Sequence, residues 1–206
     1  SSAASDVYKR QHQRCNPGYK YVFYTDAQCR RFIETHFPEK VIHAYDALIA
    51  GAHKADLFRY CELYVNGGWW FDLDTLSVGS IDALVPSTVE FACPRDCGVY
   101  DRPALYQAIL GASKGNLVLK NAIDRVVAQL ARPPPPTDWV ANLAISGPVL
   151  LGETACSTLE MRLDDGTNKG WVDSDTACFG DSIKSNGRCT LGNGVIAIAH
   201  STGAAY

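Results

Sequence analysis

An apolar strand that ends in two aspartates constrains this chain more than any other feature. Residues 66–75 read NGGWWFDLDT, so three aromatic residues at 69–71 run without polar alternation into Asp72 and Asp74. Such a run is typical of a strand covered on both faces, as in a parallel sheet. Ligands bind in the crevice at the carboxyl ends of strands in open α/β sheets, so the two acids are predicted to face a bound molecule.

The composition is that of one globular domain. The chain has 206 residues, of which 47% are hydrophobic and 20% charged, enough for a single core. A net charge of -3 gives no basic surface for a nucleic-acid backbone, which argues against nucleic acid as a partner. No apolar stretch reaches membrane-spanning length.

Eight cysteines are consistent with a disulfide but do not indicate a zinc site. They include no pair of CxxC units, so zinc is disfavoured. Cys61 lies on a helical apolar stripe and is interpreted as a buried thiol. Three others flank a polar, Gly-rich region where a disulfide could hold a loop, which favours an oxidising compartment. These three are Cys156, Cys178 and Cys189.

The first residues are interpreted separately from the domain. Residues 1–11, SSAASDVYKRQ, show no apolar periodicity and are interpreted as a non-native linker. Residues 12–206 are then predicted to form a single domain.

Apolar periodicity predicts alternating strands and helices along this domain. In the helix before the aspartates, Asp56, Arg59 and Glu62 fall away from the apolar stripe, and Gly67 ends the helix. The predicted strands are 19–25, 69–71, 88–93 and 194–201; the predicted helices are one capped by Asp26, then 41–51, 52–66, 104–110, 117–130 and one starting near Gly147. A proline run at 133–136 is predicted as an extended surface connector within the domain, and a polar stretch at 164–193 as a long loop or irregular hairpin.

Two carboxylates at a strand end suit a divalent cation. Mg²⁺ and Mn²⁺ prefer oxygen ligands and are usually held by one or two carboxylates together with substrate phosphates. An acid triplet alone is weak evidence, because the same spacing recurs at 173–175 in a polar stretch, where a solvated turn is the simpler interpretation. Its place after a buried strand is what distinguishes the first triplet.

The central segment resembles a known family. Residues 52–82, AHKADLFRYCELYVNGGWWFDLDTLSVGSID, resemble the signature of the DXD-containing sugar transferases of glycosyltransferase family 32, which includes yeast-type Golgi mannosyltransferases. Weaker similarity extends to NPGYKYVFYTD, ISGPVLL and IAIAHS. The resemblance implies an α/β fold of the GT-A type, with a mostly parallel central sheet flanked by helices. It also implies a retaining hexosyltransferase that uses Mn²⁺ or Mg²⁺ and a UDP- or GDP-sugar, with a glycan or other hydroxyl acceptor.

The resemblance also implies roles for particular residues. Asp56 and Arg59 would contact the donor sugar and its phosphates, Asp72 the ribose, sugar or metal, and Asp74 the metal, with His200 as a third ligand or phosphate contact. The alternative for Asp56 and Arg59 is a solvent-exposed helical ion pair. For His200 it is an ordinary strand-end histidine. Gly147 and Pro148 resemble a turn on the acceptor side, or simply begin a helix.

The family's opening strand, which helps to hold the nucleotide base, has no counterpart here, so the domain is expected to lack its first strand. The resemblance implies the Golgi or secretory-pathway lumen, although the chain shows no targeting segment. Any membrane anchor would lie in a segment absent from this sequence.

Two other functions fit parts of the pattern. FDLDTL after an apolar strand resembles the nucleophile motif of haloacid dehalogenase-type phosphatases, with Asp164 and Asp165 as the later acid pair. That family usually has Gly or a similar residue before the Thr and carries this strand near the chain start. A calcium-dependent carbohydrate-binding module would use the Asp-rich stretch at 164–181 instead, leaving Asp56 and Arg59 unexplained.

Overall fold

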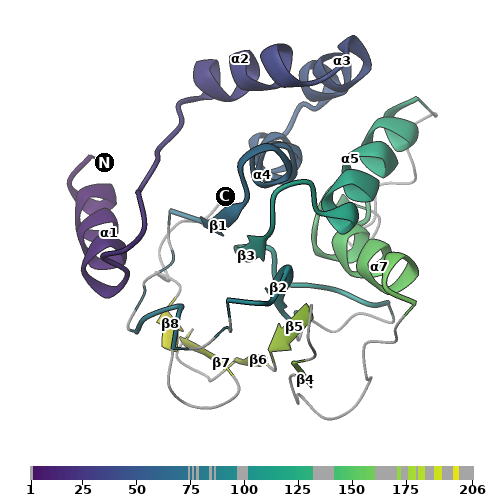
Figure 1. Ribbon diagram of the computed structural model, residues 1–206. Helices are drawn as coiled ribbons and strands as arrows, with labels where there is room; N and C mark the ends of the chain where they lie inside the picture. Colours follow the sequence, from purple (N-terminus) through teal and green to yellow (C-terminus); the bar gives the residue numbers. More distant parts are fainter. Residues whose placement is uncertain are drawn as a thin grey trace.

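The computed structural model describes residues 2–73, 75, 77, 79–83, 85, 87–96, 102–131, 142–160, 171–172, 176–179, 181–183, 188–191 and 197–199. The helices are α1 (Ser2–Cys15), α2 (Asp26–His36), α3 (Glu39–Ala47), α4 (Gly51–Asn66), α5 (Leu117–Leu130) and α7 (Pro148–Thr158). The strands are β1 (Gly68–Phe71), β2 (Phe91–Pro94), β3 (Ile109–Ala112), β4 (Trp171–Val172), β5 (Thr176–Phe179), β6 (Asp181–Ile183), β7 (Arg188–Leu191) and β8 (Ala197–Ala199) (Figure 1). The proline run, the acid pair at 164–165, the triplet at 173–175 and the side chains of Cys178 and Cys189 lie outside the described part.

Helix starts follow local capping signals. Thr25 is the N-cap of α2: its backbone N–H donates to Gln28 Oε1 at 2.8 Å, and the Gln28 N–H donates to the Thr25 hydroxyl at 3.4 Å. Asp26, predicted as the cap, is instead the first helical residue. Asn116 caps α5 by accepting from the Val118 N–H at 3.0 Å. The helices predicted after residue 25 and at 117–130 are confirmed.

The Gly67–Gly68 pair ends α4 and turns the chain into β1. Gly67 has φ +70° and Gly68 has φ +104°, which L side chains rarely adopt. A Cβ on Gly67 would also lie 2.8 Å from the Lys114 nitrogen. The helix stop predicted at Gly67 is confirmed, and β1 begins at the next residue.

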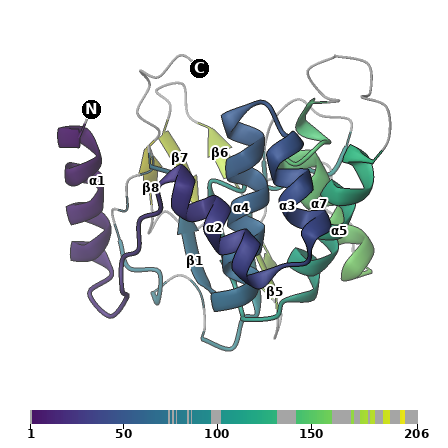
Figure 2. The ribbon, with the colours of Figure 1, turned by 90° about the horizontal axis from the view of Figure 1, so that it is seen from above.

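Helix α4 is buried on more than its apolar stripe. Asp56 is 6% and Arg59 4% exposed, although both lie off the apolar stripe that the sequence predicts for this helix. The reason is tertiary: α2, α3 and α5 contact α4 on one side, and β1 and β3 contact it on the other. Figure 2 shows α4 among these helices. Cys61, predicted as a buried thiol, is fully buried, and its burial raises the pKa of the thiol.

The described strands form a mixed sheet in the order β1-β3-β2-β5-β4. Only the β2–β5 pairing is parallel; β1 with β3, β2 with β3 and β4 with β5 are antiparallel. The predicted α/β class is confirmed, but a mostly parallel sheet is wrong for the described strands. Parallel neighbours need a crossover, usually helical, and no helix lies in the described residues between β1 and β2 or between β2 and β3. A second sheet has the order β6-β7-β8.

Two predicted elements differ in type. Residues 19–25, expected as a strand, belong to no strand in the structure, and Val22 and Phe23 are about half exposed. Residues 104–110, expected as a helix, instead run through turns into β3. Because β3 pairs with both β1 and β2, backbone hydrogen bonds from its neighbours override the local pattern.

The sheet separates two apolar clusters. Trp70 packs against the larger one, which α4, α5 and α7 share, whereas Trp69 and Phe71 pack against a smaller one around Ile109. Successive strand side chains point to opposite faces, so β1 is covered on both, as its sequence predicts. The two Trp residues are core residues, although each is only partly buried. Among the described residues, no helix is long and apolar enough to cross a membrane.

Close backbone contact at α7 gives a stability prediction. A Cβ on Gly152 would lie 2.5 Å from the Pro103 carbonyl oxygen, so the Gly152→Ala variant must displace backbone. We expect its free energy of unfolding to fall by about 1–3 kcal/mol in urea denaturation. Gly51→Ala is the matched control, because its Cβ would meet no atom within 4 Å and alanine favours a helix. Equal stability of the two variants would contradict this packing.

Candidate functional site

A tight turn after β1 places Asp72. Its N–H donates to the Ala108 carbonyl at 2.9 Å, which continues the β1–β3 contact by one residue. Its own carbonyl accepts from Thr75 twice, from the N–H at 3.0 Å and from the hydroxyl at 2.6 Å. The backbone of Asp72 is therefore held by hydrogen bonds on both sides. Asp72 begins the segment here called the acidic loop (residues 72–82, of which 72–73, 75, 77 and 79–82 are described).

The Asp72 side chain is held from β1 and α4. Trp70 Nε1–H donates to Oδ1 at 2.7 Å, and Arg59 Nη2 lies 3.1 Å from Oδ1 and 3.5 Å from Oδ2. The side chain remains 29% exposed, in contrast to that of Arg59 at 5%. Oδ2 has no other described partner, so the carboxylate keeps acceptor capacity toward a ligand.

Asp56 forms the other end of the network, one turn before Arg59 on α4. Its Oδ1 accepts from Gln107 Nε2 at 2.5 Å and lies 3.3 Å from Arg59 Nη2. Its Oδ2 accepts from the Ser146 hydroxyl at 2.8 Å and lies 3.8 Å from His53 Nδ1. A buried carboxylate with this many donors is fully compensated in its charged form.

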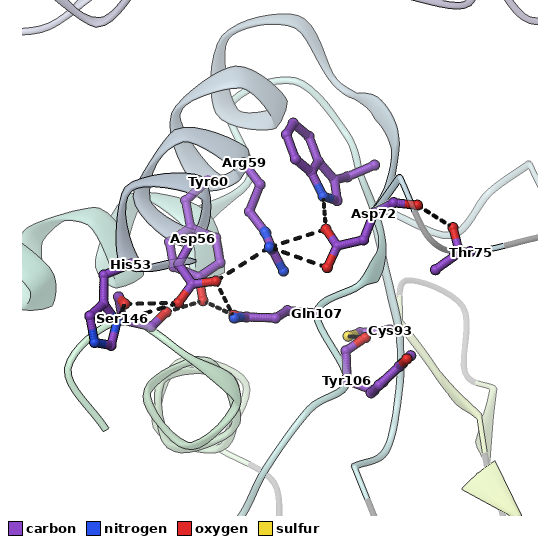
Figure 3. A network of polar contacts seen from close by, with 11 residues as sticks. His53, Asp56, Arg59, Tyr60, Asp72, Thr75, Cys93, Tyr106, Gln107 and Ser146 are labelled. Carbon is purple, nitrogen blue, oxygen red and sulfur yellow. Dashed lines mark hydrogen bonds and ion pairs between the residues drawn. The ribbon is translucent and has the colours of Figure 1, made fainter. Parts of the chain in front are cut away.

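Arg59 lies between the two carboxylates (Figure 3). Burial acts to lower the pKa of Arg59, but the attraction of Asp72 and Asp56 outweighs it and raises that pKa. The guanidinium also lies over the Trp70 ring at 5.5 Å. Its Nε is buried without a described hydrogen-bond partner. The solvent-exposed ion pair considered as an alternative is therefore wrong: Asp56 and Arg59 are buried, and they form an Asp–Arg–Asp chain with the partly exposed Asp72.

Tyr60 and Gln107 support the Asp56 end. The Tyr60 hydroxyl donates to the Ser146 carbonyl at 2.6 Å and contacts Gln107 Oε1, which orients the Gln107 amide toward Asp56. Burial, with the neighbouring Asp56 charge, raises the pKa of Tyr60 well above its usual value. Tyr60 therefore stays a neutral donor.

His53, Ser146 and Asp56 do not form a hydrolase triad, although the residue types match. His53 Nδ1 lies 2.7 Å from the Ser146 hydroxyl oxygen, but that hydroxyl gives its proton to Asp56. A serine nucleophile must instead donate to histidine, and Ser146 is fully buried. The three residues thus anchor α4 to the segment before α7.

The structure brings together three of the five predicted site residues, Asp56, Arg59 and Asp72. Asp74 and His200 lie outside the described residues, so their places in the site stay predictions. Within the described part, no group of three or more His, Cys, Asp or Glu side chains is arranged to hold a metal ion. Gly147 is the N-cap of α7 and Pro148 its first residue, which confirms the helix start predicted there.

Sequence reasoning missed the residues that orient Asp56. Gln107 falls in a segment misassigned as a helix, and no periodic signal marks it. Ser146 belongs to the ISGPVLL similarity, so that motif could have identified it. His53 lies three residues before Asp56 on the same helix, a spacing that places both on neighbouring faces.

Part of the chain matches a protein-family model. Residues 4–90 match the family model described as "Glycosyltransferase sugar-binding region containing DXD motif". The match spans Asp56, Arg59, Asp72 and Asp74. The resemblance to DXD-containing glycosyltransferases predicted from the sequence is confirmed.

Curated relatives are similar over part of their length. "Inositol phosphoceramide mannosyltransferase 3" of Schizosaccharomyces pombe is 30% identical over 110 residues, which cover 52% of this chain and 28% of the relative. "Initiation-specific alpha-1,6-mannosyltransferase" of Candida albicans is 31% identical over 83 residues, or 39% of this chain and 22% of the relative. The chain thus spans less than a third of these proteins.

A solved structure supports the fold. The chain resembles "PaToxG Glycosyltransferase" with a TM-score of 0.55 at 14% sequence identity, over 76% of this chain and 63% of that one. At this identity the likeness concerns the fold alone, which is a mixed α/β glycosyltransferase fold.

Proposed function

Because residues 4–90 match the model of a DXD-containing sugar-binding region of glycosyltransferases, we propose that this chain catalyses hexose transfer from a UDP- or GDP-sugar to a glycan or other hydroxyl acceptor. The observation that carries the proposal is the Asp56–Arg59–Asp72 chain at the end of β1, inside the matched region. The relatives named as mannosyltransferases make mannose the first sugar to test.

Asp72 and Asp74 are proposed to hold the divalent cation, with His200 as a third ligand. Asp72 fits this role because its carboxylate is charged, partly exposed and free to accept through Oδ2. Carboxylate oxygens suit Mn²⁺ and Mg²⁺. Such a cation offsets the negative charge of the departing diphosphate.

Arg59 and Asp56 are proposed as donor-site residues that also position Asp72. The Arg59 guanidinium lies within ion-pair distance of both carboxylates, which holds the Asp72 side chain in one orientation. Its burial means that contact with donor phosphates requires the guanidinium to become accessible on binding. Gln107 and Ser146 fix Asp56, so the whole network is oriented before a ligand arrives.

The proposed reaction retains the anomeric configuration. Ser146 is buried with its proton committed to Asp56, so it is not available as a covalent nucleophile. We therefore favour attack by the acceptor hydroxyl on the same face as the leaving group, with the departing phosphate taking the acceptor proton. Gly147 and Pro148 are proposed to border the acceptor side. The Golgi or secretory-pathway lumen, and anchoring through a further segment, belong to the same proposal.

Donor hydrolysis tests the proposed function. We expect slow, Mn²⁺-dependent cleavage of one sugar nucleotide from a panel of UDP- and GDP-linked hexoses that includes GDP-mannose, and a thermal shift with the same nucleotide. A ligand that binds only the folded state at about a hundred times its Kd stabilises it by roughly 2.7 kcal/mol. Cleavage of simple phosphate esters alone would favour the phosphatase alternative. Calcium-dependent sugar binding without any cleavage would favour the carbohydrate-binding module.

A further inference from the structure

The C-terminal end of α1 packs against the acidic loop. His12 is 7% exposed and lies against Phe71, with ring centroids 4.6 Å apart. Its Nε2 is 3.0 Å from the Thr75 carbonyl oxygen, and its Nδ1 is 2.6 Å from the Ser77 hydroxyl. A residue more than sixty positions earlier in the sequence thus bonds the loop twice.

These contacts define the state of the His12 ring. A carbonyl can only accept, so Nε2 carries the proton and donates to Thr75. In the neutral ring Nδ1 is then an acceptor, and the Ser77 hydroxyl donates to it. Burial lowers the pKa of His12, while the bond to the Thr75 backbone acts in the opposite sense. A neutral imidazole satisfies both buried partners at once.

Neighbouring residues secure the rest of the loop. Asn16 Oδ1 accepts from the Ile81 N–H at 2.8 Å, and Asn16 Nδ2 donates to the His12 carbonyl at 3.3 Å. The Cys15 thiol donates to the Ser77 carbonyl at 3.3 Å. Tyr19 donates its hydroxyl to Asp82 Oδ1 at 2.5 Å, and burial, together with this bond, raises the pKa of Tyr19 to about 12. Contacts therefore run from Thr75 to Asp82.

We propose that His12 is a positioning residue for the donor and metal site, which holds the acidic loop in its ligand-ready conformation through Thr75 and Ser77. Hydrogen bonds through a single residue connect His12 with Asp72. His12 bonds the Thr75 carbonyl, and the Thr75 N–H and hydroxyl bond the Asp72 carbonyl. Thr75 is fully buried, which leaves little room for the loop to shift without breaking these bonds. This inference rests on the proposed function, since it assigns the loop to donor and metal binding.

Hydrogen–deuterium exchange tests the contact itself. His12→Phe keeps a ring against Phe71 but removes both hydrogen bonds to the loop. We expect peptides that cover residues 72–85 to exchange about tenfold faster, because a lost buried hydrogen bond changes an opening equilibrium by roughly that factor. Peptides from α5 should be unchanged. Gln13→Ala, at an exposed position of the same helix, is the matched control and should exchange like the wild type. Unchanged exchange in the loop of His12→Phe would overturn the proposal.

Ligand binding tests whether the His12 contacts affect the affinity of the donor and metal site. Calorimetry with Mn²⁺ and UDP, and with Mn²⁺ and GDP, should give an apparent Kd about tenfold weaker for His12→Phe than for the wild type and Gln13→Ala. His12→Gln keeps a donor for the Thr75 carbonyl and should restore most of the affinity. Equal affinities in all variants would overturn the positioning role while leaving the proposed function intact. Failure of the wild type to bind either nucleotide with Mn²⁺ would overturn both.

Discussion

Replacement of Asp74 by Asn is expected to reduce Mn²⁺-dependent donor hydrolysis about a hundredfold or more, because a neutral amide is a poor ligand for a hard divalent cation. Asp72→Asn should cause a similar loss. The two differ in stability: Asp72 compensates the buried Arg59 charge, so its variant should also melt at a lower temperature. Initial rates of sugar release, circular dichroism and melting curves measure these effects.

The chain contains its own control for this prediction. Asp173 and Asp175 repeat the acid spacing in a polar stretch, so the Asp173→Asn/Asp175→Asn double variant removes the same charges elsewhere. We expect its hydrolysis rate to match the wild type. Loss of activity in this control, or full activity after replacement of both Asp72 and Asp74, would contradict the metal assignment.

The largest effect on stability is expected from Asp56→Ala. This change removes a carboxylate that accepts from Gln107 and Ser146 and faces Arg59, all within the protein. Breaking a buried ion pair from one side typically costs about 3–5 kcal/mol, because the remaining charge is left under-compensated. Urea denaturation should show a corresponding fall in the free energy of unfolding.

Two further variants isolate the buried charge as the cause. The Asp56→Ala/Arg59→Met double variant also removes the buried guanidinium that Asp56→Ala leaves under-compensated. The double variant should therefore be more stable than Asp56→Ala alone. Asp46→Ala breaks an exposed pair with Arg30 and should have little effect on stability. If Asp56→Ala is as mild as Asp46→Ala, the buried network contributes little to the fold.

Local sequence signals determined the helices and the strand that position the site residues. The Gly67–Gly68 pair ends α4 because only glycine readily adopts the positive φ angles found there. The aromatic run at 69–71 forms β1, and its alternation covers both faces of the strand. The polar residue at 116 starts α5 where the sequence predicts it. Such signals act within one turn or one strand, so sequence alone reveals them.

Only the tertiary structure decided how these elements meet. Asp56 and Arg59 lie off the apolar stripe of α4, yet neighbouring helices and strands bury them, because periodicity reports one helix and not what covers its other faces. Strand direction depends on the connections between strands, so an apolar run could not reveal that β1 pairs antiparallel with β3. Gln107 and His12 reach the site from distant segments, and their hydrogen bonds depend on how the chain packs rather than on any local spacing.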